Sequence, residues 1–318
     1  MQETSVISRE TSITVRGVLM ILIIIHHFYQ YTLSLVGFSY YSIISYTLQS
    51  LGYLSSGIFF ALSGYGISCS LKRNRINNKY LFRHLVKLIT PYLFVLVIYG
   101  LFYVNSITLF LKDFLTLSVS GNSLWFFKII IGFYVLAIGL KYLGIRIKRV
   151  GQIMLATTLI YVLCVFMLLP LDSYWYNSVL CFPVGFMMQR KMSASPIEDK
   201  RLLLFSAGFA ILFVIGYLNP VIPMHSLSHL MVSVITMIIG SLFLSIIVLN
   251  LISGRMISNR ILWFVGSNSL ICYLAQMLYF NNCETNGLQR YLLLVLLLLS
   301  VTVVIYDRLQ IKFFSKLV

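Results

Sequence analysis

The sequence predicts an all-α fold: a polytopic membrane bundle of about ten transmembrane helices, forming a single domain over residues 1–318. Three observations lead to it. Hydrophobic residues make up 59% of the chain and charged residues only 10%. Apolar runs of roughly twenty residues recur, the length a helix needs to cross the hydrocarbon layer. Basic residues gather in alternate connections between these runs, as expected for a multi-pass membrane protein.

Hydropathy places the spans along the whole chain. Unpaired backbone groups cannot face lipid, and the runs are too long and continuous for barrel strands, so each run predicts a helix. The predicted spans are residues 16–36, 44–68, 84–104, 123–142, 151–169, 174–190, 202–219, 229–250, 261–281 and 288–307.

The distribution of charge decides what the formal net charge of +16 means. In a soluble protein that charge would suggest a nucleic-acid partner. Here the connections after every second span hold most of the lysines and arginines, whereas the others hold only Lys112 and Arg290. The positive-inside rule therefore predicts cytoplasmic termini, a multi-pass protein of the cytoplasmic membrane, and no nucleic-acid partner. The five cysteines are scattered without CxxC spacing, which supports neither a metal site nor a disulfide framework.

The first span carries ionisable residues at membrane depth. Arg16 and His27 are eleven residues apart, so on a helix they lie within about 20° of one face and about 16 Å apart along the axis. His26 is expected to point to the side. Hydrocarbon tolerates such residues poorly, so they are functional candidates. Two structural roles stay open: Arg16 could anchor a helix end, and the histidines could hydrogen-bond between helices.

The second span ends in small residues over Gly57–Ser68. Such residues allow a close helix crossing, here expected beside the first helix, where it would hold the histidine rigidly. The basic segment Ser70–Tyr92 follows. It serves either membrane topology and anionic lipid binding, or the phosphates of a cytosolic donor.

Aromatic and polar residues occur near the predicted outer face and in the ninth span. Trp125 fits an interfacial aromatic belt, and Lys128 lies one turn inside the membrane, from where it could snorkel outward. The stretch Phe264–Gln276 is unusually polar for a span. It could cross-link helices or line a cavity.

Five motifs follow one another along the chain: Arg16 with His27, FFALSGY at 59–65, TPY at 90–92, LWFF at 124–127 and GSNSLICYL at 266–274. In this order they resemble the acyltransferase-3 family of integral membrane acyltransferases, and the resemblance covers essentially the whole chain. Two departures stand out. The family often has two arginines three apart before the third helix, whereas Lys72 and Arg75 have this spacing further upstream. Gln276 replaces a histidine that is common after the YL of the ninth span.

The resemblance implies acyl transfer, usually of acetyl from cytoplasmic acetyl-CoA, to a hydroxyl of a cell-surface carbohydrate: O-antigen, capsule, exopolysaccharide or glycolipid. Imidazole has a reference pKa of about 6.5, so neutral His27 suits a general base; it could alternatively carry the acyl group itself. Arg16 would contact donor phosphate or the pantetheine carbonyl. The remaining expected site residues are Ser63, Tyr65 and Asn268 for orientation, Lys72, Arg75, Arg83 and Lys87 for donor phosphate, and Trp125 and Lys128 on the acceptor side.

No bound cofactor and no metal are expected; membrane lipids, the acyl-CoA donor and the glycan acceptor are the expected partners. Acceptor choice is expected in the membrane helices and in the outer loops around Asn105–Ser123 and Asn219–His229. Two other functions stay open. A flippase for a lipid-linked saccharide would move its substrate without changing its mass, and a catalytically idle scaffold would tolerate loss of both Arg16 and His27.

Overall fold

The computed structural model describes residues 6–36, 42–72, 78–104, 106–120, 122–168, 172–194, 199–219, 227–282 and 288–317. Within these ranges the chain is an all-α bundle, as predicted, with one short antiparallel hairpin and one 3-10 turn. The elements are α1 (Arg9–Val36), α2 (Ile43–Lys72), α3 (Asn78–Phe102), α4 (Ile107–Thr116), β1 (Ser118–Val119), β2 (Asn122–Ser123), α5 (Trp125–Tyr142), α6 (Ile147–Leu168), η1 (Ser173–Trp175), α7 (Cys181–Ala194), α8 (Asp199–Leu218), α9 (Leu227–Ile252), α10 (Arg260–Ser267), α11 (Ser269–Asn282) and α12 (Leu288–Leu317).

Seven of the described helices are long and apolar enough to cross a membrane: α1, α2, α5, α6, α8, α9 and α12. The predicted span at 261–281 is broken, because α10 and α11 meet at an angle of 72°, and together they form at most one further span. Within the described residues of α3, Val86–Phe102 forms a shorter apolar helix, and α7 has 14 residues. The membrane character is confirmed, whereas the count of ten spans stays a prediction.

Two predicted boundaries differ from the structure. The predicted span at 174–190 begins as a helix only at Cys181, because the turn η1 precedes it. The predicted outer loop Asn105–Ser123 contains the amphipathic helix α4 and the hairpin, in the part that the structure describes. This segment is therefore built against the bundle, and Tyr92 of α3 donates a hydrogen bond to the carbonyl of Asp113 at 3.1 Å.

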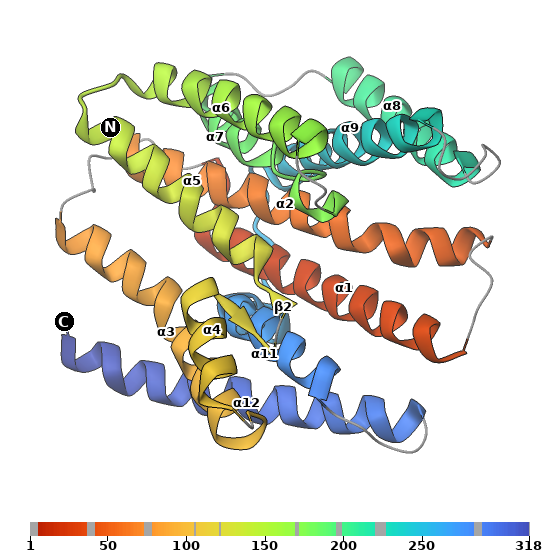
Figure 1. The fold of residues 1–318 in the computed structure, drawn as a ribbon. Helices are drawn as coiled ribbons and strands as arrows, with labels where there is room; N and C mark the ends of the chain where they lie inside the picture. Colours follow the sequence, from red (N-terminus) through yellow and green to blue (C-terminus); the bar gives the residue numbers. More distant parts are fainter. Residues whose placement is uncertain are drawn as a thin grey trace.

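Helix α2 forms the centre of the bundle (Figure 1). From Leu54 to Ser68 all of its residues except Gly66 are buried. It packs against α1 on one side and against α7, α9 and α5 on the others, while α11 leads on to α3 and α12. An apolar helix that is buried all round must be covered by neighbours on every side, which makes α2 the scaffold for the cavity described below.

The small residues at the end of α2 make their close crossing with α7 rather than with α1. A β-carbon on Gly64 would lie 2.1 Å from the carbonyl oxygen of Phe182, and one on Gly185 would lie 2.1 Å from that of Ala61. Backbone touches backbone at both points, which only glycine permits. The close crossing expected beside the first helix is instead made with α7 and α9, because Gly57 and Gly64 face those two helices, whereas Gly66 has nothing within 4 Å.

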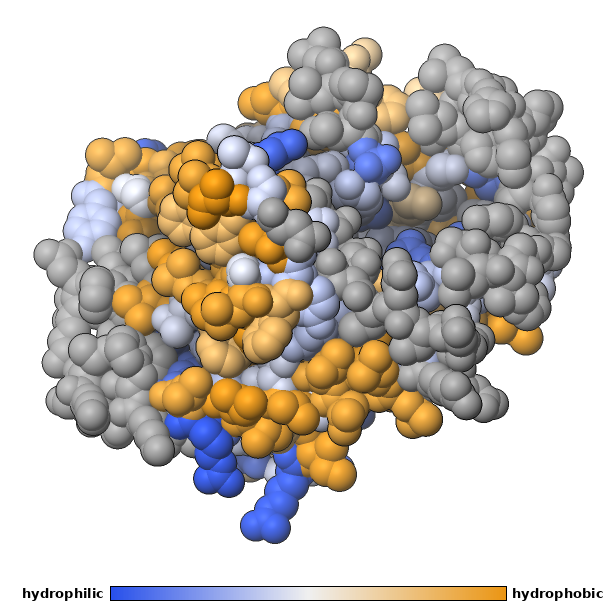
Figure 2. Space-filling model, turned by 60° about the horizontal axis from the view of Figure 1, so that its bottom comes forward, coloured by the Kyte–Doolittle hydropathy of each residue, from blue (hydrophilic) through white to orange (hydrophobic). Residues whose placement is uncertain are grey.

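Large apolar side chains are exposed around the bundle. On the face drawn in Figure 2 they cover broad contiguous areas. Helix α8 is the extreme case: it packs mainly on α9, and Leu203 and Leu204 are 71% and 70% exposed. A water-soluble protein rarely leaves such large patches uncovered, so these surfaces fit contact with lipid.

Helix α1 begins and α12 ends at the same end of the bundle, on the left of Figure 1. The basic connection between α5 and α6 lies at that end as well. The common side of the two termini agrees with the charge pattern, and its cytoplasmic placement stays a prediction.

Candidate active site

A cavity of about 580 Å³ lies inside the bundle. Its walls come from α1, α2, the start of α5, the segment around η1, and α11. This volume falls within the range of about 300–1,000 Å³ that is common for small-molecule sites. The cavity is therefore large enough to hold reacting groups away from lipid.

One stripe of α1 faces the cavity. It consists of Arg16, Met20, Ile23, His27 and Gln30, alternately four and three residues apart. This is the spacing of a single helical face, so the prediction that Arg16 and His27 share a face is confirmed. The side chain of Gln30 hydrogen-bonds His27 one turn along the helix.

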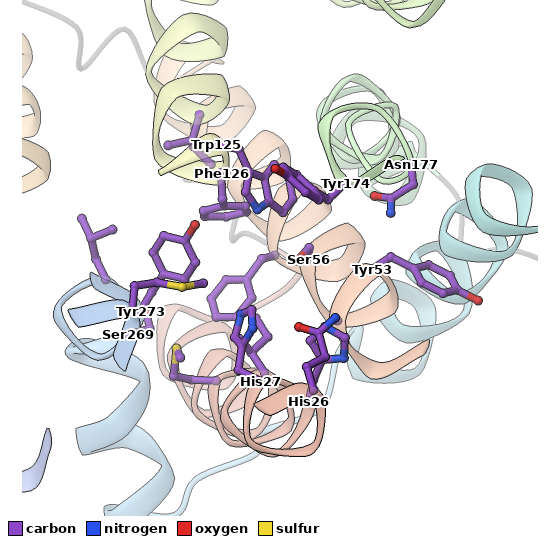
Figure 3. A pocket seen from close by; sticks show the side chains of 18 of the residues that line it. His26, His27, Tyr53, Ser56, Trp125, Phe126, Tyr174, Asn177, Ser269 and Tyr273 are labelled. Atoms are coloured by element: carbon purple, nitrogen blue, oxygen red, sulfur yellow. The ribbon is translucent and has the colours of Figure 1, made fainter. Parts of the chain in front are cut away.

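His26 borders the cavity as well, beside His27 (Figure 3). The two rings are 5.1 Å apart between centroids. The Nδ1 atom of His26 lies 3.1 Å from the backbone carbonyl oxygen of Leu48 in α2. A carbonyl only accepts, so Nδ1 must carry the proton, and in the neutral ring Nε2 keeps its lone pair. Sequence periodicity alone had placed this histidine to the side.

A polar stripe on α2 forms the second wall. Gln49, Ser56 and Ser63 are spaced by seven residues, as are Tyr46 and Tyr53, and all five line the cavity. A seven-residue period keeps side chains on nearly one face of a helix. This spacing was the signal that would have identified Gln49, Ser56, Tyr46 and Tyr53 as site residues along with Ser63.

The third wall joins two segments that are distant in sequence. Ser123, Trp125 and Phe126 come from the hairpin and the start of α5, and Tyr174 and Asn177 come from η1 and the turn after it. The rings of Trp125 and Tyr174 lie 5.7 Å apart between centroids. Figure 3 shows both rings and the Asn177 amide on the same side of the cavity, opposite the histidines.

Arg16 is the one lysine or arginine among the described residues that line the cavity, and that lining holds no carboxylate. Its Nε atom is buried and has no hydrogen-bond partner. A buried guanidinium with an unused donor favours an anionic or carbonyl-bearing ligand at this end. Tyr134 of α5 and Leu88 of α3 line the cavity too.

A family model described as an acyltransferase domain matches residues 12–306 of the chain. The chain belongs to the acyltransferase-3 family. It is thus a membrane acyltransferase, and the cavity is its candidate active site. Neither the curated proteins nor the solved structures contained a match.

For a member of the acyltransferase-3 family, the residues expected to act on the acyl group are partly brought together. Arg16, His27 and Ser63 meet at the cavity. Tyr65 is not among the described lining residues; its hydroxyl accepts a hydrogen bond of 3.2 Å from the backbone N–H of Ile7 and so fixes the start of the chain. The catalytic roles of these residues stay predictions.

Asn268 does not reach the described lining either. It stands at the break between α10 and α11, where its Nδ2 donates to the carbonyl of Phe264 and to Asp307 Oδ1, both at 3.1 Å. Its neighbour Ser269 lines the cavity instead, together with Tyr273. The polar ninth span therefore serves both purposes left open: it links helices and it lines the cavity.

Of the expected donor-phosphate residues, Lys72 and Lys87 are not among the described residues that line the cavity. Lys72 ends α2 and is exposed, and Lys87 is exposed near the start of α3. Leu88, the next residue, does line the cavity, so this part of α3 borders it. Arg75 and the side chain of Arg83 lie outside the described residues, as does the loop from residue 220 to 226.

On the expected acceptor side, Trp125 lines the cavity and Lys128 does not. The Nζ atom of Lys128 donates to Ser123 Oγ at 2.7 Å and lies 5.7 Å from the centroid of the Trp175 ring. Lys128 thus links Ser123 and Trp175 at the edge of the cavity, which is called the rim below. In the part of the chain that the structure describes, no three histidine, cysteine or acidic side chains lie close enough to bind a metal ion.

Proposed function

We propose that this membrane acyltransferase transfers an acetyl group from acetyl-CoA to a hydroxyl of a cell-surface carbohydrate, with His27 as general base. The observation that carries the proposal is the shared cavity: Arg16 and His27 line one space, at two depths of the same helix. The donor would enter near Arg16 and the acceptor near Trp125 and Tyr174. O-antigen, capsule, exopolysaccharide and glycolipid are the acceptors we consider.

In this reaction the hydroxyl oxygen bonds to the thioester carbonyl carbon while the carbon–sulfur bond breaks. The hydroxyl proton passes to the imidazole of His27 and then to the departing sulfur, which gives an ester and a free thiol. A sugar hydroxyl is a weak nucleophile at neutral pH, so a base at this point supplies much of the rate. The Gln30 side chain would orient the ring, and Arg16 would hold donor phosphate or the pantetheine carbonyl.

The test uses membrane vesicles that contain the chain, acetyl-CoA labelled in the acetyl group, and a glycan acceptor. Label and acetyl mass should appear on the acceptor, whereas a flippase would leave its mass unchanged. Removing a general base typically costs about 10²- to 10⁴-fold in rate, so His27→Ala should lose at least 100-fold. Thermal unfolding in detergent, unchanged from that of the original protein, serves as the folding control.

Two results would contradict the assignment of His27 as base. A folded His27→Ala variant with normal transfer would exclude it. Label that stays on His27 when acceptor is withheld would replace it with an acyl-histidine relay. Normal cell-surface modification in a variant lacking both Arg16 and His27 would instead point to a non-catalytic scaffold.

A further inference from the structure

The part of the cavity away from Arg16, here called the outer half, differs in chemistry from the part that contains Arg16. Its wall is formed by aromatic rings and uncharged amide and hydroxyl groups: Gln49, Tyr53, Ser123, Trp125, Tyr174 and Asn177. Pockets for small molecules combine apolar or aromatic walls with a few placed polar groups in this way. The function of this wall is not explained by a base and a donor site alone.

Asn177 gives the most direct sign that a ligand belongs here. The residue is 5% exposed, and its Oδ1 atom is buried without a hydrogen-bond partner. Its backbone carbonyl accepts a 3.0 Å hydrogen bond from Ser241 Oγ of α9, which fixes the residue in place. Figure 3 shows its amide directed toward the cavity. Buried acceptors are normally satisfied, so a ligand with a hydroxyl donor fits this position.

Trp125 and Tyr174 add two neighbouring aromatic faces next to that acceptor. Their centroids are 5.7 Å apart, with the rings inclined by 42°. Amphipathic rings of this kind pair an apolar body with a polar edge. The C–H face of a sugar ring packs on such a surface while its hydroxyls reach the neighbouring amides.

The charges near this wall do not favour an acidic ligand. The described lining contains no lysine, and Arg16 lies at the other end of the cavity. At the rim, Lys128 is held by Ser123, and Asp172 hydrogen-bonds Tyr174. Burial, and after it the neighbouring Asp172, raise the pKa of the Tyr174 hydroxyl. Among the described lining residues of this wall a buried carboxylate or phosphate would meet no lysine or arginine, and the Lys128 ammonium at the rim is already bonded to Ser123.

We propose that this wall is the acceptor site and that it takes an uncharged glycosyl ring, stacked on Trp125 and Tyr174 and oriented by Asn177. The inference rests on the proposed acyl transfer and narrows its substrate class. His27 lies across the cavity from the wall, where it can take the proton of the bound hydroxyl.

The test compares two acceptors of matched size, octyl β-glucoside and octyl β-glucuronide, with labelled acetyl-CoA and the full-length chain in membranes. We expect the glucoside to be acetylated at least tenfold more efficiently. Asn177→Asp keeps the shape and adds a negative charge next to the hydroxyls. It should raise KM for the glucoside at least tenfold while KM for acetyl-CoA stays the same.

Asn250→Asp is the matched control, because Asn250 bonds the carbonyl of Ile246 within α9 and does not belong to the described lining. It should leave both KM values unchanged. Equal use of glucoside and glucuronide, or an unchanged glucoside KM in Asn177→Asp, would overturn the acceptor site while acetyl transfer stands. No acetyl transfer to either glycoside, nor to a cell-surface glycan extract, would overturn the proposed function with it.

Discussion

The imidazole of His26 lies over Gly52 so closely that a β-carbon at Gly52 would come within 2.4 Å of the His26 Nε2 atom. The missing side chain lets α1 approach α2 at the depth of the two histidines. The same ring is tied to α2 by its bond to the Leu48 carbonyl, one turn earlier. This crossing, rather than the small residues at the end of α2, holds the histidine pair in place.

Gly52→Ala should therefore reduce acyl transfer at least tenfold, because the added methyl group displaces the His26 ring and with it the face that carries His27. The measurement is transfer of labelled acetyl in membranes. Gly66→Ala in the same helix is the control, since nothing lies within 4 Å of its added methyl group. Full activity in Gly52→Ala would show that the crossing is not needed for catalysis.

The crossing of α2 and α7 predicts a stability effect. Gly64→Ala places a methyl group against the carbonyl of Phe182, and overpacking of this kind typically costs about 1–3 kcal/mol. We expect a lower midpoint of thermal unfolding in detergent for Gly64→Ala. Gly139→Ala in α5, where a β-carbon meets open space, should unfold at the original temperature. A midpoint in Gly64→Ala equal to that of Gly139→Ala would contradict the close crossing.

Arg16→Lys tests how the end of the cavity that contains Arg16 holds the acyl donor. Lysine keeps the charge but cannot offer the two parallel donors of a guanidinium. We expect KM for acetyl-CoA to rise about tenfold while KM for the acceptor stays unchanged. Arg9→Lys, an exposed position on the same helix, should change neither value. An increase in the acceptor KM instead would move Arg16 to the acceptor side.

Lys72 at the end of α2 and Lys87, next to the lining residue Leu88, are exposed lysines outside the described lining. Exposed lysines suit the phosphates of a donor that extends beyond the cavity. The double variant Lys72→Gln with Lys87→Gln should raise KM for acetyl-CoA several-fold and leave KM for acetyl-pantetheine, which lacks the phosphates, unchanged. Lys148→Gln, in the first turn of α6, is the control. Equal effects on both donors would show that these lysines act through structure rather than through phosphate binding.

Several features of the site followed from local geometry. Arg16 and His27 had to share a face once the first span was a helix, because helical periodicity is set by the backbone alone. The polar residues of α2 obey a seven-residue period that is equally readable in the sequence. In contrast, Tyr65 in α2 and Asn268 at the break before α11 lie in segments that border the cavity, yet each uses its polar group to bond another part of the chain. Which face of a buried helix meets which neighbour is a property of packing.

The amino-acid sequence determined the all-α membrane architecture, because long apolar runs in lipid have helices as their available structure, and it determined the face shared by Arg16 and His27. The tertiary structure decided the rest of the site. Asn177 and Tyr174 reach the wall opposite the histidines from a turn that precedes α7, and they meet Trp125 there although about fifty residues separate them. The glycine contacts set how closely α1, α2 and α7 approach, and such contacts between distant backbones leave no periodic trace in the sequence.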